Sequence, residues 1–549
     1  MKTKKILSIV TLFGISLSLF VCSSPMAAAT GQTFALGALQ DNTPSISDKP
    51  SSGGVCATNL PTSVDLSQDK YFPPIGSQGE IGSCASWAST YYQFTYQVAR
   101  LNNWDAKNDA TKRFSPRWTY NFCNYNSDQT KHDNCGSFFR DNYTILKYQG
   151  AARFTEFPPT EYPNNIDTEN KTWCLDTSVM RNALKTRISD FKEYNFADSS
   201  VNTPITSYDD TDLNQIKTFL ATGNVLTFCT DFYTWDYKTL SNNEIGCIKV
   251  YDDNSQWDGH ALTIVGYDDT ISYDLNGDGI IEPYEKGAFK IANSWGSEYY
   301  KNNGFVWLMY DALNKVSNTS VQQVANREAA FDNYSYNYIQ VQNYTPQLIG
   351  DITLSQTSRN EINLSSGMSD VASTLPTTTF GTALCPNELW IKSDPIGFNG
   401  IDNTRQDATF LMDFSMYNSG SQRSNYYATV ADTTANSNNT IVKNIRLEDK
   451  NNSTILNLPY TTSIDGSTCN FKYRLGKYGD VDNNGLIDTN DITRIQQYMA
   501  SQVTLSSDDL KAADVNGDGV VSLKDASKIQ QYLSNVITTF PAGILVYLG

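Results

Sequence analysis

The chain has 549 residues, of which 40% are hydrophobic, and a formal net charge of −17. This length exceeds one ordinary domain, so we expect a multidomain protein with about two to four folded units. The acidic balance excludes nucleic acid and anionic lipid as natural partners, because like charges repel, and it favours calcium instead.

The first 29 residues predict a secretory signal peptide. A basic start precedes an apolar stretch and a run of small residues: Lys2, Lys4 and Lys5, then 6–21, then 27–29. We therefore expect a secreted, extracellular protein with no membrane attachment after cleavage. Loss of the three lysines changes the net charge from −17 to −20. Cys22 leaves a lipoprotein open as an alternative, although Val21 stands where a small residue is expected.

A glutamine and a cysteine lie close together in the run Gln78-Gly-Glu-Ile-Gly-Ser-Cys84. Apolar residues at helical spacing follow, and Ser83 is a candidate N-cap, so Cys84 is expected in the first turn of a helix. The unpaired amides of a helix N-terminus favour an anion. We therefore expect a thiolate at Cys84, with a pKa below the free value of about 8.5.

Far downstream, His260 begins an apolar, β-branched run that reads as a buried strand, and Asn293 precedes Ser294 and Trp295. A thiol nucleophile needs a base, the base needs an orienting partner, and the developing oxyanion needs donors. Cys84, His260, Asn293 and Gln78 can fill these four roles in that order. We expect Trp295 to shield the hydrogen bond between His260 and Asn293 from water.

These residues resemble the papain family of cysteine peptidases over about 60–316. The resemblance implies a two-lobed α+β fold with a cleft between the lobes, and hydrolysis of protein or peptide substrates through a thioester. It implies that Cys84 is the nucleophile, His260 the acid and base, Asn293 the orienting residue and Gln78 the oxyanion donor. The family often has a cysteine where Ile81 stands here. It often has a tryptophan directly after the nucleophile, whereas here that residue is displaced to Trp87.

Residues 30–57 are rich in Ser, Thr, Pro and Gly, and they read as a linker or short pro-segment. They are too short for the folded pro-domain that is usual in the family. We therefore expect this segment to block the cleft loosely or not at all.

The cysteine count indicates one free thiol. Ten cysteines become nine after signal cleavage, and the odd one is assigned to Cys84. The other eight allow four disulfides, or none in a reducing environment. Proximity and domain membership favour Cys123–Cys135, Cys229–Cys247 and Cys385–Cys469, with Cys56–Cys174 by elimination.

Oxygen-bearing residues between His260 and Asn293 follow the spacing of an EF-hand calcium loop, with Gly279 at position 6. Pro283 at position 10 argues against the usual exiting helix. We therefore expect a calcium-binding insert that rigidifies the hairpin carrying His260 and Asn293, with a solvated acidic turn as the alternative. The expected ligands of this one ion are Asp274, Asn276, Asp278, Ile280 through its carbonyl, Glu282 and Glu285.

Two further loops of this kind repeat 34 residues apart, each followed by a helix with Ile-Gln-Gln-Tyr and with no entering helix expected. They resemble dockerin type modules over about 477–535. The resemblance implies calcium-dependent binding to a cohesin domain of a scaffoldin or cell-surface protein, with an EF-hand sensor pair as the alternative. The expected ligands are Asp480, Asp482, Asn484, Leu486, Asp488 and Asp491 for one ion, and Asp514, Asn516, Asp518, Val520, Ser522 and Asp525 for the second.

The fold class we expect is multidomain: an α+β papain-like two-lobed peptidase, a β-sandwich-like middle domain and a small all-α calcium-binding dockerin. Short alternating stretches such as 408–416 and 441–447 suggest the sandwich. The expected limits are 1–29 for the signal peptide, 30–57 for the linker, 58–320 for the peptidase, 330–472 for the β-rich domain, 476–538 for the dockerin and 539–549 for a tail.

The function expected from these patterns is a secreted cysteine endopeptidase attached to a cellulosome-like complex. Two alternatives remain open. One is a non-catalytic adaptor with a papain-like fold, and the other is a papain-like transferase or amidase that acts on cell-wall peptides.

Overall fold

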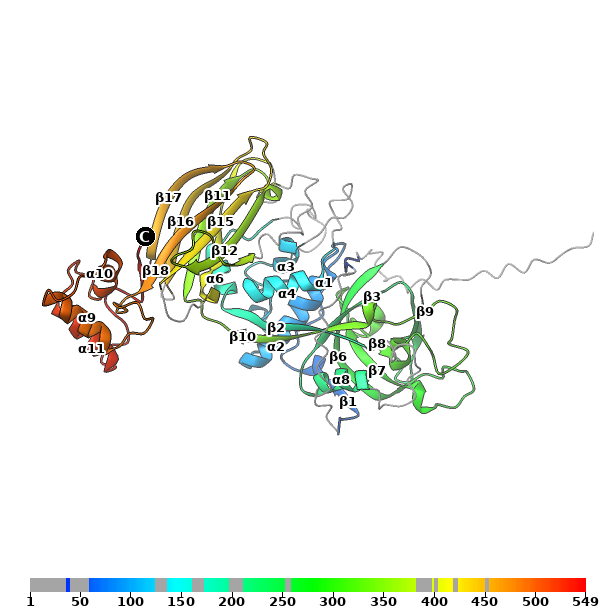
Figure 1. Cartoon of the computed structure of the whole chain (residues 1–549). Coiled ribbons are helices and arrows are strands. Elements are labelled where there is room, and N and C mark those ends of the chain that lie inside the picture. Colours follow the sequence, from blue (N-terminus) through cyan, green and yellow to red (C-terminus); the bar gives the residue numbers. More distant parts are fainter. Residues whose placement is uncertain are drawn as a thin grey trace, which may run out of the picture.

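The structure is a computed structural model, and it describes residues 36–39, 59–123, 136–159, 172–196, 211–251, 258–381, 397–398, 403–417, 423–449 and 454–549. The predicted signal peptide and Cys22 lie outside the described residues, as do Cys56, Cys135 and Cys385. Three units follow one another along the molecule, and we call them the N-terminal, middle and C-terminal units (Figure 1).

The N-terminal unit has helices on one side and a large sheet on the other (Figure 1). The helix that begins at Cys84 is buried on every side, because its residues are almost all aromatic, small or hydroxylated. It continues without a break as a π-helical segment, η2 (Trp87–Phe94). The α-helices of this unit are α1 (Cys84–Ser86), α2 (Thr95–Asn102), α3 (Pro116–Cys123), α4 (Phe139–Tyr148), α6 (Thr177–Ala183) and α8 (Thr211–Ala221).

The sheet of the N-terminal unit has ten strands in the described residues, in the order β2-β10-β3-β6-β7-β8-β5-β4, with β1 paired to β6 and β9 to β5. β10 lies past the limit at 320 that the sequence suggested for this domain. The strands are β1 (Ser63–Asp65), β2 (Thr186–Asn195), β3 (Leu226–Asp231), β4 (Trp235–Thr239), β5 (Ile245–Tyr251), β6 (Gly259–Ser272), β7 (Lys286–Ala292), β8 (Phe305–Met309), β9 (Arg327–Glu328) and β10 (Ser335–Asn343).

The middle unit consists of two antiparallel sheets that share one apolar core. A strand covers all of 441–447, and a strand covers 408–413 of the predicted stretch 408–416, which ends in a 3₁₀ turn from Phe414. One sheet has the order β14-β11-β16-β17, with β11 (Leu348–Gln356), β14 (Gln406–Asp413), β16 (Thr440–Asp449) and β17 (Thr454–Ile464). The other has the order β13-β12-β15-β18-β19, with β12 (Ile362–Asp370), β13 (Thr378–Gly381), β15 (Ser424–Asp432), β18 (Thr468–Lys477) and β19 (Leu545–Tyr547).

The C-terminal unit has its own small core, which includes Val481, Ile495, Val515 and Ile529. Its helices are α9 (Thr489–Met499), α10 (Ser507–Ala513) and α11 (Leu523–Leu533). α9 and α11 follow the two predicted calcium loops, as expected. α10 was not expected: it leads directly into the second loop, and a capping box between Ser506 and Asp509 starts it.

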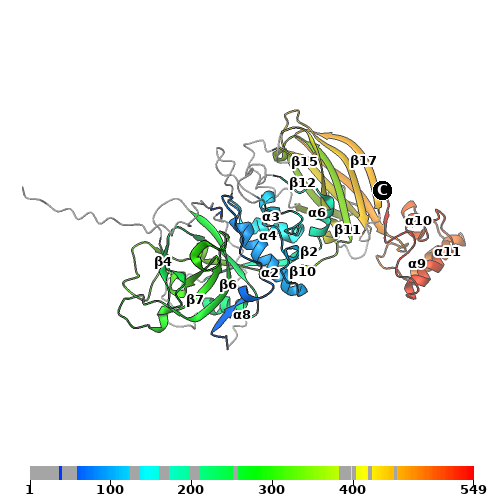
Figure 2. The same cartoon turned by 180° about the vertical axis from the view of Figure 1, so that it is seen from behind.

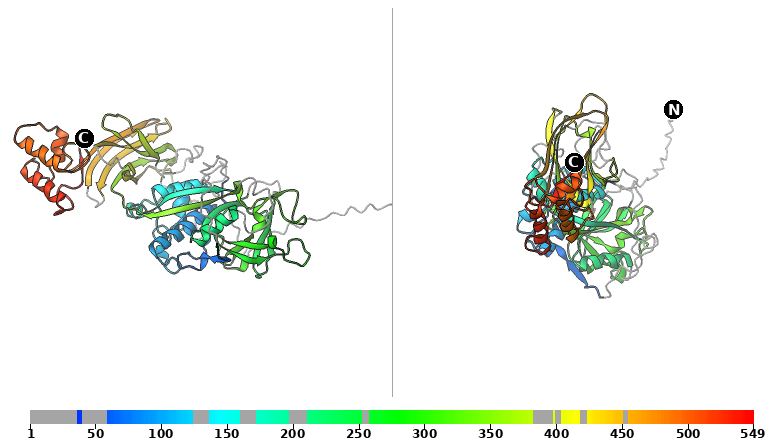
Figure 3. Two further views of the ribbon diagram at one scale, coloured as in Figure 1. Left: turned by 60° about the horizontal axis from the view of Figure 1, so that its bottom comes forward. Right: turned by 60° about the vertical axis from the view of Figure 1, so that its left-hand side comes forward.

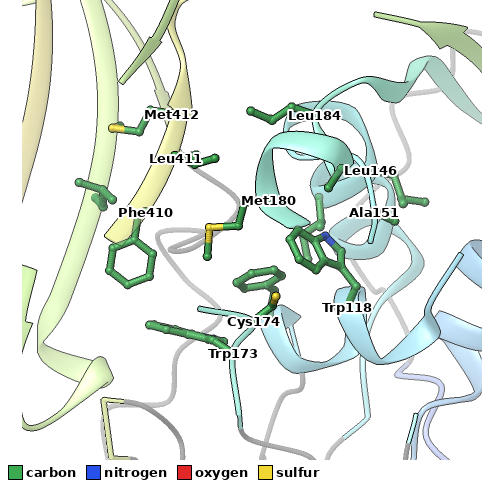
Figure 4. Close-up of a cluster of buried hydrophobic side chains, with 14 of the residues drawn as sticks. Trp118, Leu146, Ala151, Trp173, Cys174, Met180, Leu184, Phe410, Leu411 and Met412 are labelled. Atoms are coloured by element: carbon green, nitrogen blue, oxygen red, sulfur yellow. The ribbon is translucent and has the colours of Figure 1, made fainter. Parts of the chain in front are cut away.

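The middle unit lies between the other two and contacts both (Figures 1 and 2). Toward the N-terminal unit, one continuous apolar core crosses the junction: Phe410, Leu411 and Met412 face Met180 and Leu184 (Figure 4). A buried ion pair between Arg187 and Asp413, with 2.8 Å between nitrogen and oxygen, lies at the same junction.

The C-terminal unit follows the middle unit along the chain (Figure 3), and two ion pairs join them. Arg423 pairs with Asp509 at 2.7 Å, and Arg474 pairs with Asp508 at 3.1 Å. After α11 the chain returns, and β19 pairs with β18. The C-terminal unit is therefore connected to the middle unit on both its N-terminal and C-terminal sides.

The cysteines differ from the predicted disulfides. Cys247 carries a free thiol, which contradicts the Cys229–Cys247 pair. Cys123, Cys174 and Cys469 also carry free thiols. Cys247 lies fully buried in a packed core, so it needs no cross-link to be ordered. No helix within the described part of the chain is long and apolar enough to cross a membrane.

Candidate active site

Cys84 is the first residue of α1 and is fully buried. This is the predicted position, although the side chain of Ser83 makes no capping hydrogen bond. α1 packs against β6, and the backbone amide of Ala261, the residue after His260, acts to lower the pKa of the Cys84 thiol. The start of the helix and the start of β6 therefore meet at the thiol.

His260 and Asn293 lie on neighbouring strands. His260 is the second residue of β6, and Asn293 follows the end of β7, its antiparallel partner. The distance from His260 Nε2 to Asn293 Oδ1 is 2.8 Å. Because an amide oxygen can only accept, His260 donates from Nε2, and Nδ1 is left with a lone pair. Among the described residues, Nδ1 is buried and has no hydrogen-bond partner.

Aromatic rings enclose the imidazole. The centroid of Trp295 lies 4.7 Å from that of His260, and Phe232 lies 4.8 Å away on another side. This is the shielding that the sequence predicted for Trp295. Burial lowers the pKa of His260 to about 4, against a smaller opposing effect of the Asn293 hydrogen bond. The imidazole is therefore neutral at neutral pH.

Gln78 is buried beside the same loop and is fixed at both ends of its amide. Ser294 Oγ donates to Gln78 Oε1 at 2.6 Å, and Gln78 Nε2 donates to the Ile81 carbonyl at 2.8 Å. A side-chain amide can donate through two N–H groups, which makes Gln78 a candidate donor to an oxyanion. The sequence singled out Gln78 but missed Ser294, although it directly follows Asn293.

Four residues of the predicted linker cover the thiol. The amides of Gly37 and Ala38 both donate to the Gly259 carbonyl, at 3.2 and 3.0 Å. The amide of Ser137 donates to the Gly37 carbonyl at 2.9 Å, and the amide of Leu39 donates to the Ser137 carbonyl at 3.3 Å. Ala38 is only 3% exposed. The segment Leu36–Leu39 is therefore seated by four backbone hydrogen bonds, tighter than the loose or absent cover that we expected.

The covered thiol does not have the predicted low pKa. Burial raises the pKa of Cys84 to about 11, although the amides of Ala261, Gly37 and Ala85 favour the thiolate. The prediction of a resting thiolate is thus wrong for this form. The helix N-terminus acts in the predicted direction, but the loss of water outweighs it.

The loop 274–285 joins β6 and β7, as the sequence predicted. Its backbone folds around its own carboxylates. The amide of Gly279 donates to the Asp274 carboxylate at 2.8 Å, and the amide of Glu282 donates to the Glu285 carboxylate at 3.1 Å. Pro283 begins a single 3₁₀ turn, η4 (Pro283–Glu285), and no exiting helix follows in the described residues. Glu282 Oε2 is buried with no hydrogen-bond partner among these residues.

The two loops of the C-terminal unit repeat this hydrogen-bond pattern. Gly485 donates to Asp480 at 3.1 Å, and Gly519 donates to Asp514 at 2.9 Å. The carboxylates of Asp480, Asp482 and Asp491 gather within 4.8 Å, and burial raises the pKa of Asp491 to about 6. Asp480 Oδ1 is buried and has no hydrogen-bond partner within the described chain. Carboxylate and amide oxygens are the donors that calcium prefers, so this donor set fits that ion.

Residues 478–534 match the family model described as the dockerin type I domain. They form a dockerin type I domain. The chain is also similar to the ScaB dockerin from Acetivibrio cellulolyticus, solved in complex with the third cohesin of ScaC, at 33% identity, 12% coverage of this chain, 90% of that chain and a TM-score of 0.11. The dockerin here spans α9–α11 and ends before β19.

Solved structures similar to the N-terminal part are cysteine proteases. Xylellain from Xylella fastidiosa is 20% identical and covers 56% of this chain and 97% of its own, with a TM-score of 0.34. A procathepsin B from Trypanosoma congolense is 14% identical and covers 56% and 87%, with a TM-score of 0.34. No curated protein matches this chain.

Proposed function

We propose that the protein is a secreted cysteine endopeptidase that is anchored to a cellulosome-like complex. The observation that carries the peptidase proposal is the 2.8 Å hydrogen bond between His260 Nε2 and Asn293 Oδ1, which leaves Nδ1 with no hydrogen-bond partner among the described residues. His260 lies on β6, the strand that packs against the helix of Cys84. The buried amide of Gln78, fixed by Ser294, supports an oxyanion site at the same place.

The reaction follows from these positions. His260 Nδ1 accepts the proton of the Cys84 thiol as Sγ attacks the carbonyl carbon of the substrate. The developing oxyanion accepts hydrogen bonds from Gln78 Nε2 and the Cys84 amide. His260 returns the proton to the leaving amine, and a thioester remains. A water molecule then hydrolyses the thioester, with His260 again acting first as base and then as acid.

The test is intact-mass analysis after exposure to an epoxysuccinyl probe, with Cys84→Ala beside the wild type. We expect one adduct on the wild type and none on the variant. If the folded full chain gives no adduct, the same measurement after removal of residues 30–57 separates a covered enzyme from a non-catalytic adaptor. An adaptor stays unlabelled in both forms, which would overturn the peptidase proposal.

In this proposal the dockerin attaches the protein to the complex. Its two loops hold two calcium ions through the donor set at 480–491 and 514–525, and the loop 274–285 holds a third ion in the peptidase domain. When bound, calcium neutralises the gathered carboxylates and fixes each loop. The partner is a cohesin domain of a scaffoldin or cell-surface protein.

Binding to a panel of type I cohesin domains, measured with calcium and after chelation, tests whether the dockerin attaches the protein in this way. We expect binding to at least one cohesin that is lost with the double variant Asp480→Ala and Asp514→Ala. Binding that survives chelation and the double variant would contradict calcium dependence. Peptidase activity of that variant serves as the control, because the peptidase site lies in the N-terminal unit.

A further inference from the structure

The helix that carries Cys84 changes its winding at Trp87, where α1 passes into the π-helical segment η2. In an α-helix each residue turns about 100°, so residues five apart point about 140° away from each other. A π-helical turn bonds residue i to residue i+5, so residues five apart return to nearly the same side. Trp87, Tyr91 and Tyr92 therefore share one face of the helix.

This face holds the loop that leads to Gln78. The ring of Trp87 occupies the space beside Gly76, where an added Cβ would lie 2.1 Å from the ring. Tyr91 Oη donates to the Pro74 carbonyl at 3.0 Å. The amide of Gly76 donates to Tyr92 Oη at 3.1 Å.

The Tyr92 hydroxyl also contacts the orienting residue. It donates to the backbone carbonyl of Asn293 at 2.9 Å, and the tyrosine is 1% exposed. Burial raises the pKa of Tyr92 well above its usual range, so the hydroxyl keeps its proton and stays a donor. The ring is held in place by Phe72, which stacks on it with 5.4 Å between the centroids.

We propose that Tyr92 is a positioning residue for the Cys84–His260–Asn293 centre, a role that rests on the proposed function. One hydroxyl links the helix of the nucleophile, the backbone of the residue that orients the base, and the loop of the oxyanion donor. It touches neither substrate nor the reacting atoms. Its contribution is to keep Asn293 Oδ1 at hydrogen-bond distance from His260 Nε2 while the imidazole gains and loses its proton.

The kinetic test compares Tyr92→Phe with Tyr91→Phe in the folded full chain, with any activating cleavage that the wild type needs applied to all three proteins. Tyr91 is the matched control, because it is also buried in η2 and binds the same loop, but has no bond to Asn293. We expect Tyr92→Phe to lower kcat about tenfold, the effect of one hydrogen bond, with little change in KM. Tyr91→Phe should lower the melting temperature about as much as Tyr92→Phe does, but it should leave kcat within about twofold of the wild-type value. Equal losses of kcat in both variants, or none in Tyr92→Phe, would overturn the proposal.

A second measurement does not depend on peptidase activity. The chain has only two histidines, so ¹⁵N-histidine labelling isolates the Nε2 proton that His260 donates to Asn293. We expect this proton to exchange with water at least tenfold faster in Tyr92→Phe than in Tyr91→Phe or the wild type. Unchanged exchange would count against the positioning role even if the wild type hydrolyses no peptide. A wild type without activity, but with the expected exchange, would count against the proposed function alone.

Discussion

His260 shows how burial sets the protonation of one residue. Its ring lies among Trp295 and Phe232, and the loss of water lowers its pKa to about 4 from an ordinary 6.5. The unfolded chain therefore binds a proton at a higher pH than the folded chain does. The stability that this burial contributes is fully present above pH 6.5 and is lost as the pH falls toward 4.

We predict that the wild type loses about 3 kcal/mol more unfolding free energy than His260→Gln between pH 6.5 and pH 4, as an upper value for this shift. Chemical denaturation followed by tryptophan fluorescence at several pH values measures the difference. His132→Gln is the control, and it should follow the wild type. A His260→Gln variant that is equally sensitive to acid would contradict the assigned pKa.

Gly37 is the residue of the covering segment that allows no side chain. An added Cβ would lie 1.9 Å from the Gly82 carbonyl oxygen, which is backbone and has little room to move. We predict that Gly37→Val unseats the segment and increases the rate of Cys84 alkylation by iodoacetamide at least tenfold. Gly54→Val, in the same linker, should alkylate at the wild-type rate. If both variants react alike, the segment does not protect the thiol.

The grouping of Cys84, His260, Asn293 and Gln78 could be read from the sequence, because each belongs to a short motif with a chemical reason for its spacing. Gly37 and Tyr92 could not. Gly37 stands in a linker without a motif, and its role appears only when Gly82 and Gly259 are in place. Tyr92 shares a helix face with Trp87 because the helix is π-wound, whereas α-helical spacing would turn the two about 140° apart.

At the scale of elements, the hairpin of β6 and β7 carries both His260 and Asn293, and the loop 274–285 closes it. A residue pattern was enough to place this loop, because an EF-hand spacing needs no tertiary context. The middle sheets followed from alternation. Their link to β19 did not, since three residues give no strand signal of their own.

Calcium should stabilise the hairpin. At free calcium 100-fold above the dissociation constant, binding stabilises the folded state by about 2.7 kcal/mol. We predict that chelation lowers the melting temperature of the N-terminal unit and that Asp274→Ala abolishes this sensitivity. Tryptophan fluorescence is the right signal, because no tryptophan follows Trp390 and the dockerin is therefore silent.

Asp268→Ala is the matched control for that experiment. Asp268 lies on β6 close to the loop, and its carboxylate accepts from Thr270 rather than from the loop amides. This variant should keep the full response to chelation. If chelation does not change the melting temperature of the wild type, the proposed calcium site in the loop 274–285 is wrong.

At the scale of the whole molecule, the N-terminal and middle units share one apolar core, whereas the C-terminal unit has a core of its own. Trp173 stacks edge-on against Phe410 across the junction, with 5.4 Å between the ring centroids. The sequence predicts a domain boundary between these two units, because its residue pattern changes there. A residue pattern does not show which surfaces pack against each other. The two units should unfold together.

We predict that Phe410→Ala destabilises a single tryptophan-reported transition by about 3–5 kcal/mol, the usual loss for a buried phenylalanine. Phe540→Ala, in the separate dockerin core, is the matched control and should leave that transition unchanged. Calorimetry with parallel fluorescence measures both. Two tryptophan-reported transitions, of which Phe410→Ala shifts only one, would show that the units unfold independently.

The return of β19 to β18 has a consequence for the order in which the protein matures. β19 follows the dockerin in the chain, so the ribosome synthesises it only after the dockerin. Until then β18 presents an unpaired edge on that side, which is a template for aggregation. A chain that stops before residue 545 thus leaves this edge open, so the sheet to which β18 belongs is complete only after the chain beyond the dockerin has been made.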